Sequence, residues 1–212
     1  SFLEAIRLLS IPSSFFHAAS TDTFGDHGGV VLNENSPFRP RSPYAIAKLT
    51  GYWLTRSYRE NYGLHATNGI LSNHESPLRG EGFVTNKIVS ALQSNLSGQE
   101  KDLVLGDVSV VRDWLWAPDV ARAILAIVEA AEPRDYVVAS GESHSLGELI
   151  EAIARELGIE RDPLYSTDPS LLRDAEISAI RLDPSALIRD TGWKPTVDFQ
   201  GLAHRLAHRI LE

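Results

Sequence analysis

Short apolar runs alternate with longer segments of helical periodicity, and this alternation constrains the fold more than any other feature of the sequence. Residues 14–20 form an apolar run that ends in small residues, as expected of a strand buried on both faces. A long helix is predicted next, with Ser42 as its N-cap, Pro43 at its first position and Gly63 after its last turn. Residues 65–71 are predicted to form the next strand. Strands and helices in this order predict a parallel α/β sheet.

The alternation continues in the second half of the chain and becomes less regular after Gly158. Helices are predicted at 83–96, 118–131, 146–157 and 199–211, and short strands at 103–105 and 136–139. Ser145 and Glu148 have the spacing of a capping box in front of the third of these helices. We therefore expect residues 1–72 to belong to the parallel sheet and residues 73–212 to form mainly a smaller, mixed α/β lobe.

Charge and composition exclude several classes of function. The formal net charge is −8 and the lysines and arginines form no cluster, so we expect neither nucleic acid nor a membrane as a partner. The absence of cysteine excludes disulfides, thiol catalysis and thiolate metal sites. No apolar run approaches the roughly 18 residues of a membrane-spanning helix, and we expect a cytoplasmic protein. The chain also lacks methionine and begins in the middle of a helical pattern, so we expect it to be a segment of a longer protein.

Tyr44 and Lys48 have the spacing Tyr-x-x-x-Lys within the predicted long helix. Residues four apart share one face of a helix, so the phenol and the ammonium should point to the same place. A nearby ammonium favours the phenolate form of tyrosine, which suits general acid/base catalysis. Ser20 stands where the first predicted strand opens into a loop, and parallel sheets place reactive groups at such strand ends. These three side chains predict a catalytic site, although Tyr-x-x-x-Lys alone is also typical of a tyrosine at the edge of the core beside a solvated lysine.

Longer motifs identify a family resemblance. Together with Arg-Pro-Arg-Ser-Pro-Tyr at 39–44, the residues above resemble the extended short-chain dehydrogenase/reductase family. Four further segments resemble the GDP-mannose 4,6-dehydratase family within it, namely Asn-His-Glu-Ser-Pro-Leu-Arg-Gly-Glu-Gly-Phe-Val-Thr-Asn-Lys-Ile at 73–88, Arg-Asp-Trp at 112–114, the stretch 135–145 and Gly-Trp-Lys-Pro at 192–195. The resemblance implies that 1–72 is the distal part of a Rossmann-type NADP-binding domain. It also implies a nucleotide-sugar-binding lobe in 73–212, from which some segments return to the sheet.

The resemblance also implies a reaction. In that family a phenolate takes the proton of the sugar 4-hydroxyl while hydride leaves C4 for bound NADP. A carboxylate then removes the C5 proton, water leaves from C6, and the same hydride returns to C6. Tyr44 matches the phenol, Lys48 the residue that tunes it and holds the nicotinamide ribose, and Ser20 the hydroxyl that bonds the reacting oxygen. The implied activity is dehydration of GDP-mannose, or of a close GDP-hexose, to GDP-4-keto-6-deoxymannose by a homo-oligomer.

Asp22 departs from the family, which has glutamate two positions after the hydroxyl. A carboxylate remains, but it is one methylene shorter, and misplacing a base by about 1 Å can cost on the order of a hundredfold in rate. We expect Asp22 to be the base that removes the C5 proton, and the alternative is a turn or capping carboxylate at a strand end. Phe24 replaces the tyrosine usual in the family, a change that we expect to affect packing only.

The remaining matches to the family concern binding. His74 and Arg79 match positions that contact the cofactor, and a guanidinium suits a phosphate group because of its forked donors. The residues that match GDP-binding positions are Asn73, Val84, Lys87 and Arg112, with Arg173 and Glu176 as a looser match to a late Arg-x-x-Glu pair. For each arginine, the alternative is a surface ion pair that contributes little.

Rossmann-type dinucleotide binding needs a glycine-rich turn between a strand and a helix, where the pyrophosphate binds. The sequence contains no such turn, because Gly25, Gly28 and Gly29 follow a predicted strand but lead into a Pro-rich loop. We therefore expect the 212 residues alone not to bind NADP in the usual manner and to be inactive by themselves.

Other functions and sites were weighed against this interpretation. A related nucleotide-sugar reductase or epimerase is one alternative, and a truncated, non-catalytic homologue is another. A carboxylate at Asp22 distinguishes dehydration from the first alternative, which does not need it. His204 and His208 lie four apart on the last predicted helix, but no third ligand with suitable spacing follows, so we expect a solvated helix face and no metal.

Overall fold

The computed structural model describes residues 2–99, 101–160, 162–172 and 176–211. The helices are α1 (Phe2–Leu9), α2 (Pro43–Tyr62), α3 (Val84–Leu96), α4 (Ala117–Glu129), α5 (Leu146–Glu156), α6 (Ser185–Thr191) and α7 (Phe199–Ala207). The strands are β1 (Phe15–Ser20), β2 (Val31–Leu32), β3 (Ala66–Leu71), β4 (Asn73–Glu75), β5 (Val104–Leu105), β6 (Val111–Trp116), β7 (Asp135–Val138), β8 (Ser143–Ser145), β9 (Ser166–Thr167) and β10 (Arg181–Leu182). None of the helices within these ranges has both the length and the apolar character needed to cross a membrane.

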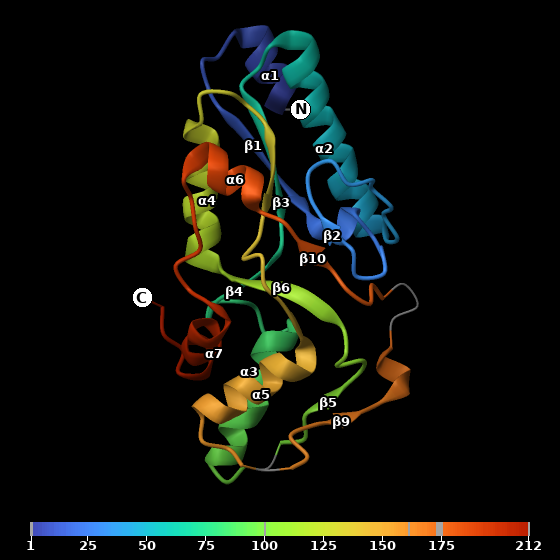
Figure 1. Cartoon of the computed structure of the whole chain (residues 1–212), viewed down its shortest axis with the longest axis vertical. Coiled ribbons are helices and arrows are strands. Elements are labelled where there is room, and N and C mark those ends of the chain that lie inside the picture. Colours follow the sequence, from blue (N-terminus) through green and yellow to red (C-terminus); the bar gives the residue numbers. More distant parts are fainter. Residues whose placement is uncertain (1, 100, 161, 173–175, 212) are drawn as a thin grey trace.

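A parallel sheet in the order β1-β3-β7 forms one end of the elongated molecule (Figure 1). Ser20 pairs with Leu71, and Leu71 pairs with Val138, so the three strands reach the same level at their carboxyl ends. Figure 1 shows α2 on one side of this sheet and α4 on the other. The predicted parallel α/β sheet is thereby confirmed.

The other end of the molecule contains α3, α5 and α7 around a second apolar core (Figure 1). Ile88 of α3, Ile153 of α5 and Leu202 of α7 are among the side chains buried there. Between the two ends runs β6, which pairs with β4 in parallel and with β8 in antiparallel orientation. Two further parallel pairs, β2 with β10 and β5 with β9, join segments that are far apart in the sequence.

The predicted helix boundaries are confirmed most closely where capping residues define them. The Ser42 hydroxyl accepts a hydrogen bond from the Ala45 N–H at 3.1 Å, and Gly63 ends α2 with a φ of 65°. The capping box of Ser145 and Glu148 also forms. Each of these capping residues provides a hydrogen bond for a backbone group that the helix itself leaves without a partner. The partners lie within a few residues of each other, so the helix ends can be predicted from the sequence.

Other expectations were wrong. In β1 only Ala19 is buried and the other five residues are half-buried, because among the described strands β1 pairs with β3 alone and lies at the edge of its sheet. The last helix ends at Ala207, four residues before the predicted boundary. The strands β2, β4, β6, β8, β9 and β10 and the helix α6 were not predicted from the sequence, and the domain boundary between residues 72 and 73 stays a prediction.

The Asp135 carboxylate, at the start of β7, fixes α2 against the sheet. Arg59 of α2 donates two hydrogen bonds to it, at 2.8 and 2.7 Å, and Tyr52 of the same helix donates one at 2.9 Å. Asn68 of β3 donates a fourth at 2.7 Å. The side chains of Asp135 and Arg59 are only 8% and 14% exposed. Burial and the neighbouring carboxylate raise the pKa of Tyr52, so its hydroxyl remains a donor.

We predict that Asp135→Ala lowers the free energy of unfolding by about 3–5 kcal/mol, because it leaves the Arg59 guanidinium buried without its carboxylate. The measurement is urea unfolding followed by circular dichroism. Glu60→Ala is the matched control, since Glu60 pairs with Arg56 at 2.6 Å on the exposed side of the same helix and should change stability by less than about 1 kcal/mol. Equal losses in the two variants would contradict the importance given to the Asp135 contacts.

Candidate active site

The carboxyl ends of β1 and β3, the first turn of α2 and the loop after β4 surround a pocket of about 490 Å³. Parallel sheets bind their ligands at this end of the strands. Eight of the residues predicted from the sequence line the pocket, namely Ser20, Asp22, Tyr44, Lys48, Asn73, His74, Arg79 and Val84. The structure thus gathers residues that are up to 64 positions apart in the chain into one place.

Tyr44 and Lys48 lie on the pocket side of the first turns of α2. The Lys48 Nζ is 5.7 Å from the centre of the Tyr44 ring and donates a hydrogen bond to the Ala18 carbonyl of β1 at 3.0 Å. The phenol is 54% exposed, so it is accessible to a molecule that enters the pocket. The predicted placement of the two side chains on one helix face is confirmed, and Lys48 also ties α2 to β1.

Ser20 and Asp22 occupy the point where β1 ends and a short 3-10 helix, Thr21–Thr23, begins. The Ser20 Oγ accepts a hydrogen bond from the Asp22 N–H at 3.2 Å, and the Thr23 hydroxyl donates to the Ser20 carbonyl at 2.6 Å. These contacts fix the backbone of the turn, so that Ser20 and the half-buried Asp22 both line the pocket. Phe24, next in the chain, is fully buried and stacks on Phe38 at 5.3 Å between ring centres, as expected of a packing residue.

Glu75 positions Arg79 at the same pocket, a role that the sequence analysis did not assign. Arg79 donates to the Glu75 carboxylate at 2.7 Å and to the His74 carbonyl, and the Thr85 hydroxyl donates to the other Glu75 oxygen at 2.6 Å. The Arg79 guanidinium lies 4.0 Å from the centre of the Phe83 ring. Burial raises the pKa of Glu75 to about 7. In the sequence, only the spacing of four residues between Glu75 and Arg79 indicates that the two side chains could form a pair.

The other predicted binding residues that the structure describes, Lys87, Arg112 and Glu176, do not line this pocket. Lys87 donates to the Val104 carbonyl of β5. Arg112 of β6 forms an ion pair with Glu176 at 2.7 Å, and these side chains are 12% and 31% exposed. Arg173 lies outside the described residues, so the predicted pairing of Arg173 with Glu176 at a ligand stays a prediction.

Comparisons with known protein sequences identify one family. The family model for GDP-mannose 4,6 dehydratase matches residues 1–206. GDP-mannose 4,6-dehydratase of Vibrio cholerae serotype O1 is 37% identical over 239 residues, which cover 99% of this chain and 64% of that protein. GDP-mannose 4,6 dehydratase 2 of Arabidopsis thaliana is 39% identical over 214 residues, which cover 99% of this chain and 57% of that protein. The chain therefore spans about three fifths of the length of these relatives.

A solved structure supports the same conclusion for the fold. The structure of RMD from Pseudomonas aeruginosa complexed with NADPH superimposes with a TM-score of 0.87 and 26% sequence identity. The match covers 98% of this chain and 69% of the other. It confirms the predicted Rossmann-type α/β class.

We predict that Glu75→Gln changes how stability depends on pH. In the folded chain the pKa of Glu75 is raised from 4.5 to about 7, so between these values the folded state binds more protons than the unfolded state, and stability falls as the pH rises. Relative to Glu75→Gln, the parent chain should lose up to about 3 kcal/mol of unfolding free energy between pH 4.5 and pH 7. The measurement is urea unfolding at both pH values, with the exposed Glu81→Gln as the control, and parallel profiles for parent and Glu75→Gln would contradict it.

Proposed function

The chain belongs to the GDP-mannose 4,6-dehydratase family, and on that premise we propose that it carries the catalytic groups of an enzyme that dehydrates GDP-mannose, or a close GDP-hexose, to GDP-4-keto-6-deoxymannose. The observation that carries this proposal is that Ser20, Asp22, Tyr44 and Lys48 line one pocket. A hydroxyl, a carboxylate, a phenol and an ammonium are together the groups that oxidation at C4 and elimination across C5 and C6 require.

Tyr44 is the proposed base for the sugar 4-hydroxyl. Its exposed ring borders the pocket, and the Lys48 ammonium lies 5.7 Å from the centre of that ring. Because Lys48 is held by the Ala18 carbonyl, its charge stays close to the phenol. Ser20 borders the same pocket and would donate its hydroxyl hydrogen bond to the reacting oxygen, which orients that oxygen toward Tyr44.

Asp22 is the proposed base for the C5 proton. It enters the pocket from the turn after β1, two residues beyond Ser20, and is half-buried there. A carboxylate in this place removes the C5 proton once C4 is a ketone, because the ketone makes that proton acidic. Loss of water from C6 then completes the elimination. The side chain is one methylene shorter than glutamate, so its reach is the weakest part of the arrangement.

NADP is the proposed cofactor, with Tyr44, Lys48, His74 and Arg79 as its contacts. The Arg79 Nε is buried at the pocket and has no hydrogen-bond partner among the described residues, and this donor suits an anionic phosphate group. When bound, NADP supplies the acceptor, and later the donor, of the hydride exchanged with the sugar. The NADPH complex of the similar RMD structure supports this class of cofactor.

The pocket fits only part of that cofactor. Within the described residues, no strand is followed by a glycine-rich turn that enters a helix, so a pyrophosphate cradle of the Rossmann type is not among them. We propose that these 212 residues by themselves do not turn over substrate.

The GDP moiety is proposed to contact the second half of the chain. Asn73 and Val84 reach the pocket directly, whereas Lys87, Arg112 and Glu176 lie beyond it, on α3, β6 and the segment before β10. The proposed contacts with the nucleotide are Asn73, Val84, Lys87, Arg112, Arg173 and Glu176. Homo-oligomerisation and a cytoplasmic location stay predictions.

A related nucleotide-sugar reductase or epimerase is the second candidate. It would use Ser20, Tyr44 and Lys48 in the same way and leave Asp22 without a chemical role. The half-buried position of Asp22 at the pocket wall favours dehydration, because neither alternative reaction needs a carboxylate there.

We predict that Tyr44→Phe abolishes turnover while leaving the affinity for the GDP-sugar within a few fold, since the hydroxyl acts in proton transfer and not in nucleotide binding. Steady-state kinetics and calorimetry would measure this in a form of the protein that has a complete nucleotide-binding domain. Tyr62→Phe is the matched control, because Tyr62 is also 54% exposed but lies at the far end of α2. More than about a tenth of the parent activity in Tyr44→Phe would remove Tyr44 from the role of base.

We predict that Asp22→Asn stops dehydration but still permits oxidation at C4, because the two steps depend on different side chains. The measurement is absorbance of the reduced nicotinamide in a single turnover with GDP-mannose, where the signal should persist. Asp22→Glu retains the carboxylate and should dehydrate at the parent rate or faster. Dehydration at the parent rate by Asp22→Asn would make Asp22 a turn residue and favour the reductase or epimerase.

A further inference from the structure

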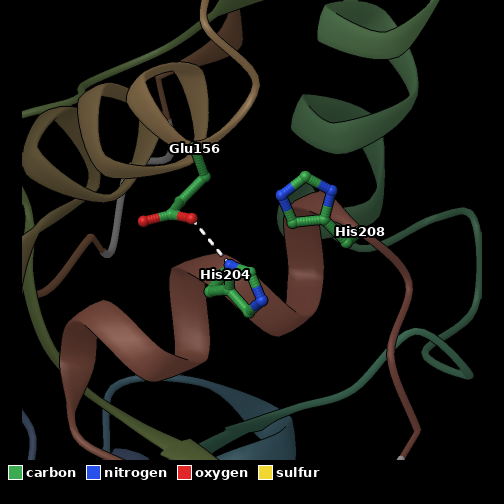
Figure 2. A group of neighbouring side chains, drawn as sticks. All are labelled: Glu156, His204 and His208. Atoms are coloured by element: carbon green, nitrogen blue, oxygen red, sulfur yellow. Dashed lines mark hydrogen bonds and ion pairs between the residues drawn. The ribbon is translucent and has the colours of Figure 1, made fainter.

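The ends of α5 and α7 bring Glu156, His204 and His208 together (Figure 2), and none of the three lines the candidate active-site pocket. The His204 Nδ1 is 2.7 Å from the Glu156 carboxylate, and the His204 and His208 ring centres are 4.7 Å apart. One nitrogen of each imidazole and one carboxylate oxygen all lie within 4.8 Å of one another. The third donor could not be recognised from sequence spacing, because Glu156 precedes His204 by 48 residues and belongs to another helix.

The backbone that carries these three side chains is held in place by packing. α5 and α7 pack together through Ile150, Ile153, Leu202 and Leu206, all buried in the second core. The carboxyl end of α7 is further tied to α3, since Gln93 donates to the Ala207 carbonyl at 2.8 Å and accepts from Arg209 at 3.0 Å. A ligand would therefore meet three side chains that extend from a backbone fixed before it binds, and small rotations of these side chains would bring the donor atoms to it.

The electrostatics of this place favour a cation. Glu156 is the last residue of α5, His204 lies in the last turn of α7 and His208 is its C-cap, so two helix carboxyl ends meet at the cluster. Helix carboxyl ends carry partial negative charge, which stabilises cations and disfavours an additional carboxylate. A positive ion between the three side chains would be attracted by both helix ends and by Glu156.

We propose that Glu156, His204 and His208 form a binding site for a divalent transition metal ion of the zinc class. Two imidazoles and one carboxylate are a donor set that Zn²⁺ accepts, with water in the remaining position of the tetrahedron. Imidazole donors select such ions over Mg²⁺ and Ca²⁺, which prefer oxygen ligands. The ion takes the place of the hydrogen bond between His204 and Glu156 and connects the ends of α5 and α7. The site is independent of the proposed enzyme function.

The test is calorimetric titration of the chelator-treated whole protein with ZnCl₂, together with thermal unfolding. One zinc ion per chain should bind, and a free concentration of about 100 Kd should raise Tm by about 5–10 °C. His208→Ala leaves the contact between His204 and Glu156 intact, yet it should weaken zinc binding more than about tenfold and abolish the rise in Tm. Glu156→Gln should do the same, and MgCl₂ should give neither heat of binding nor a shift in Tm.

Glu151→Gln is the matched control, because it removes the same charge from an exposed position of α5 outside the cluster and should bind zinc as the parent does. Failure of the parent to bind zinc would overturn the proposal, and the three side chains would then form only a surface hydrogen-bond cluster. Parent-like binding by both His208→Ala and Glu156→Gln would also overturn it. Parent-like folding of each variant without metal is established by circular dichroism.

Discussion

A buried negative charge on Asp135 meets four donors from α2 and β3, and the position of the candidate active site depends on this interaction. Tyr44 and Lys48 lie at the amino end of α2. Tyr52, in the middle of this helix, and Arg59, near its carboxyl end, contact Asp135. The helix is thus held against the sheet along its length, at Asp135 by hydrogen bonds and at Ala18 by Lys48. A carboxylate that is removed from water in this way is stable only when its hydrogen-bond donors are in place. The Asp135 contacts therefore fix the position of α2 on the sheet.

Two other buried aspartates connect segments in the same manner. Asp113 of β6 accepts from the Ser140 and Gly141 N–H groups, both at 2.9 Å, and burial raises its pKa to about 6. Asp119 of α4 accepts from the N–H groups of Thr196, at 2.9 Å, and Val197, at 3.2 Å. Through these contacts β6 fixes the turn after β7, and α4 fixes the segment before α7. Buried carboxylates that accept backbone N–H groups fix loops that apolar packing alone leaves free to shift.

The sequence predicted the fold best where an interaction is formed entirely by residues that are close together in the chain, as in helix capping. Ser42, Pro43 and Gly63 define α2 because capping is satisfied within a few residues. The strand β6 was not predicted, since Arg112 and Asp113 interrupt its apolar pattern and their partners, Glu176 and the turn at Ser140, are distant in sequence. The long continuous motif 73–88 predicted four pocket residues, Asn73, His74, Arg79 and Val84. The role of Glu75 and the cluster at Glu156 were not predicted from the sequence, because the first depends on burial and the second on contact between two separate helices.

We propose that the groups around this pocket remove water from a GDP-hexose. The most direct measurement is mass spectrometry of the product formed from GDP-mannose and NADP by a form of the protein with a complete nucleotide-binding domain. We expect a product lighter than GDP-mannose by one water molecule, with one deuterium at C5 when the reaction runs in heavy water. A product of unchanged mass, as an epimerase would give, or recovery of GDP-mannose alone, as a reductase would give because GDP-mannose carries no ketone to reduce, would contradict it.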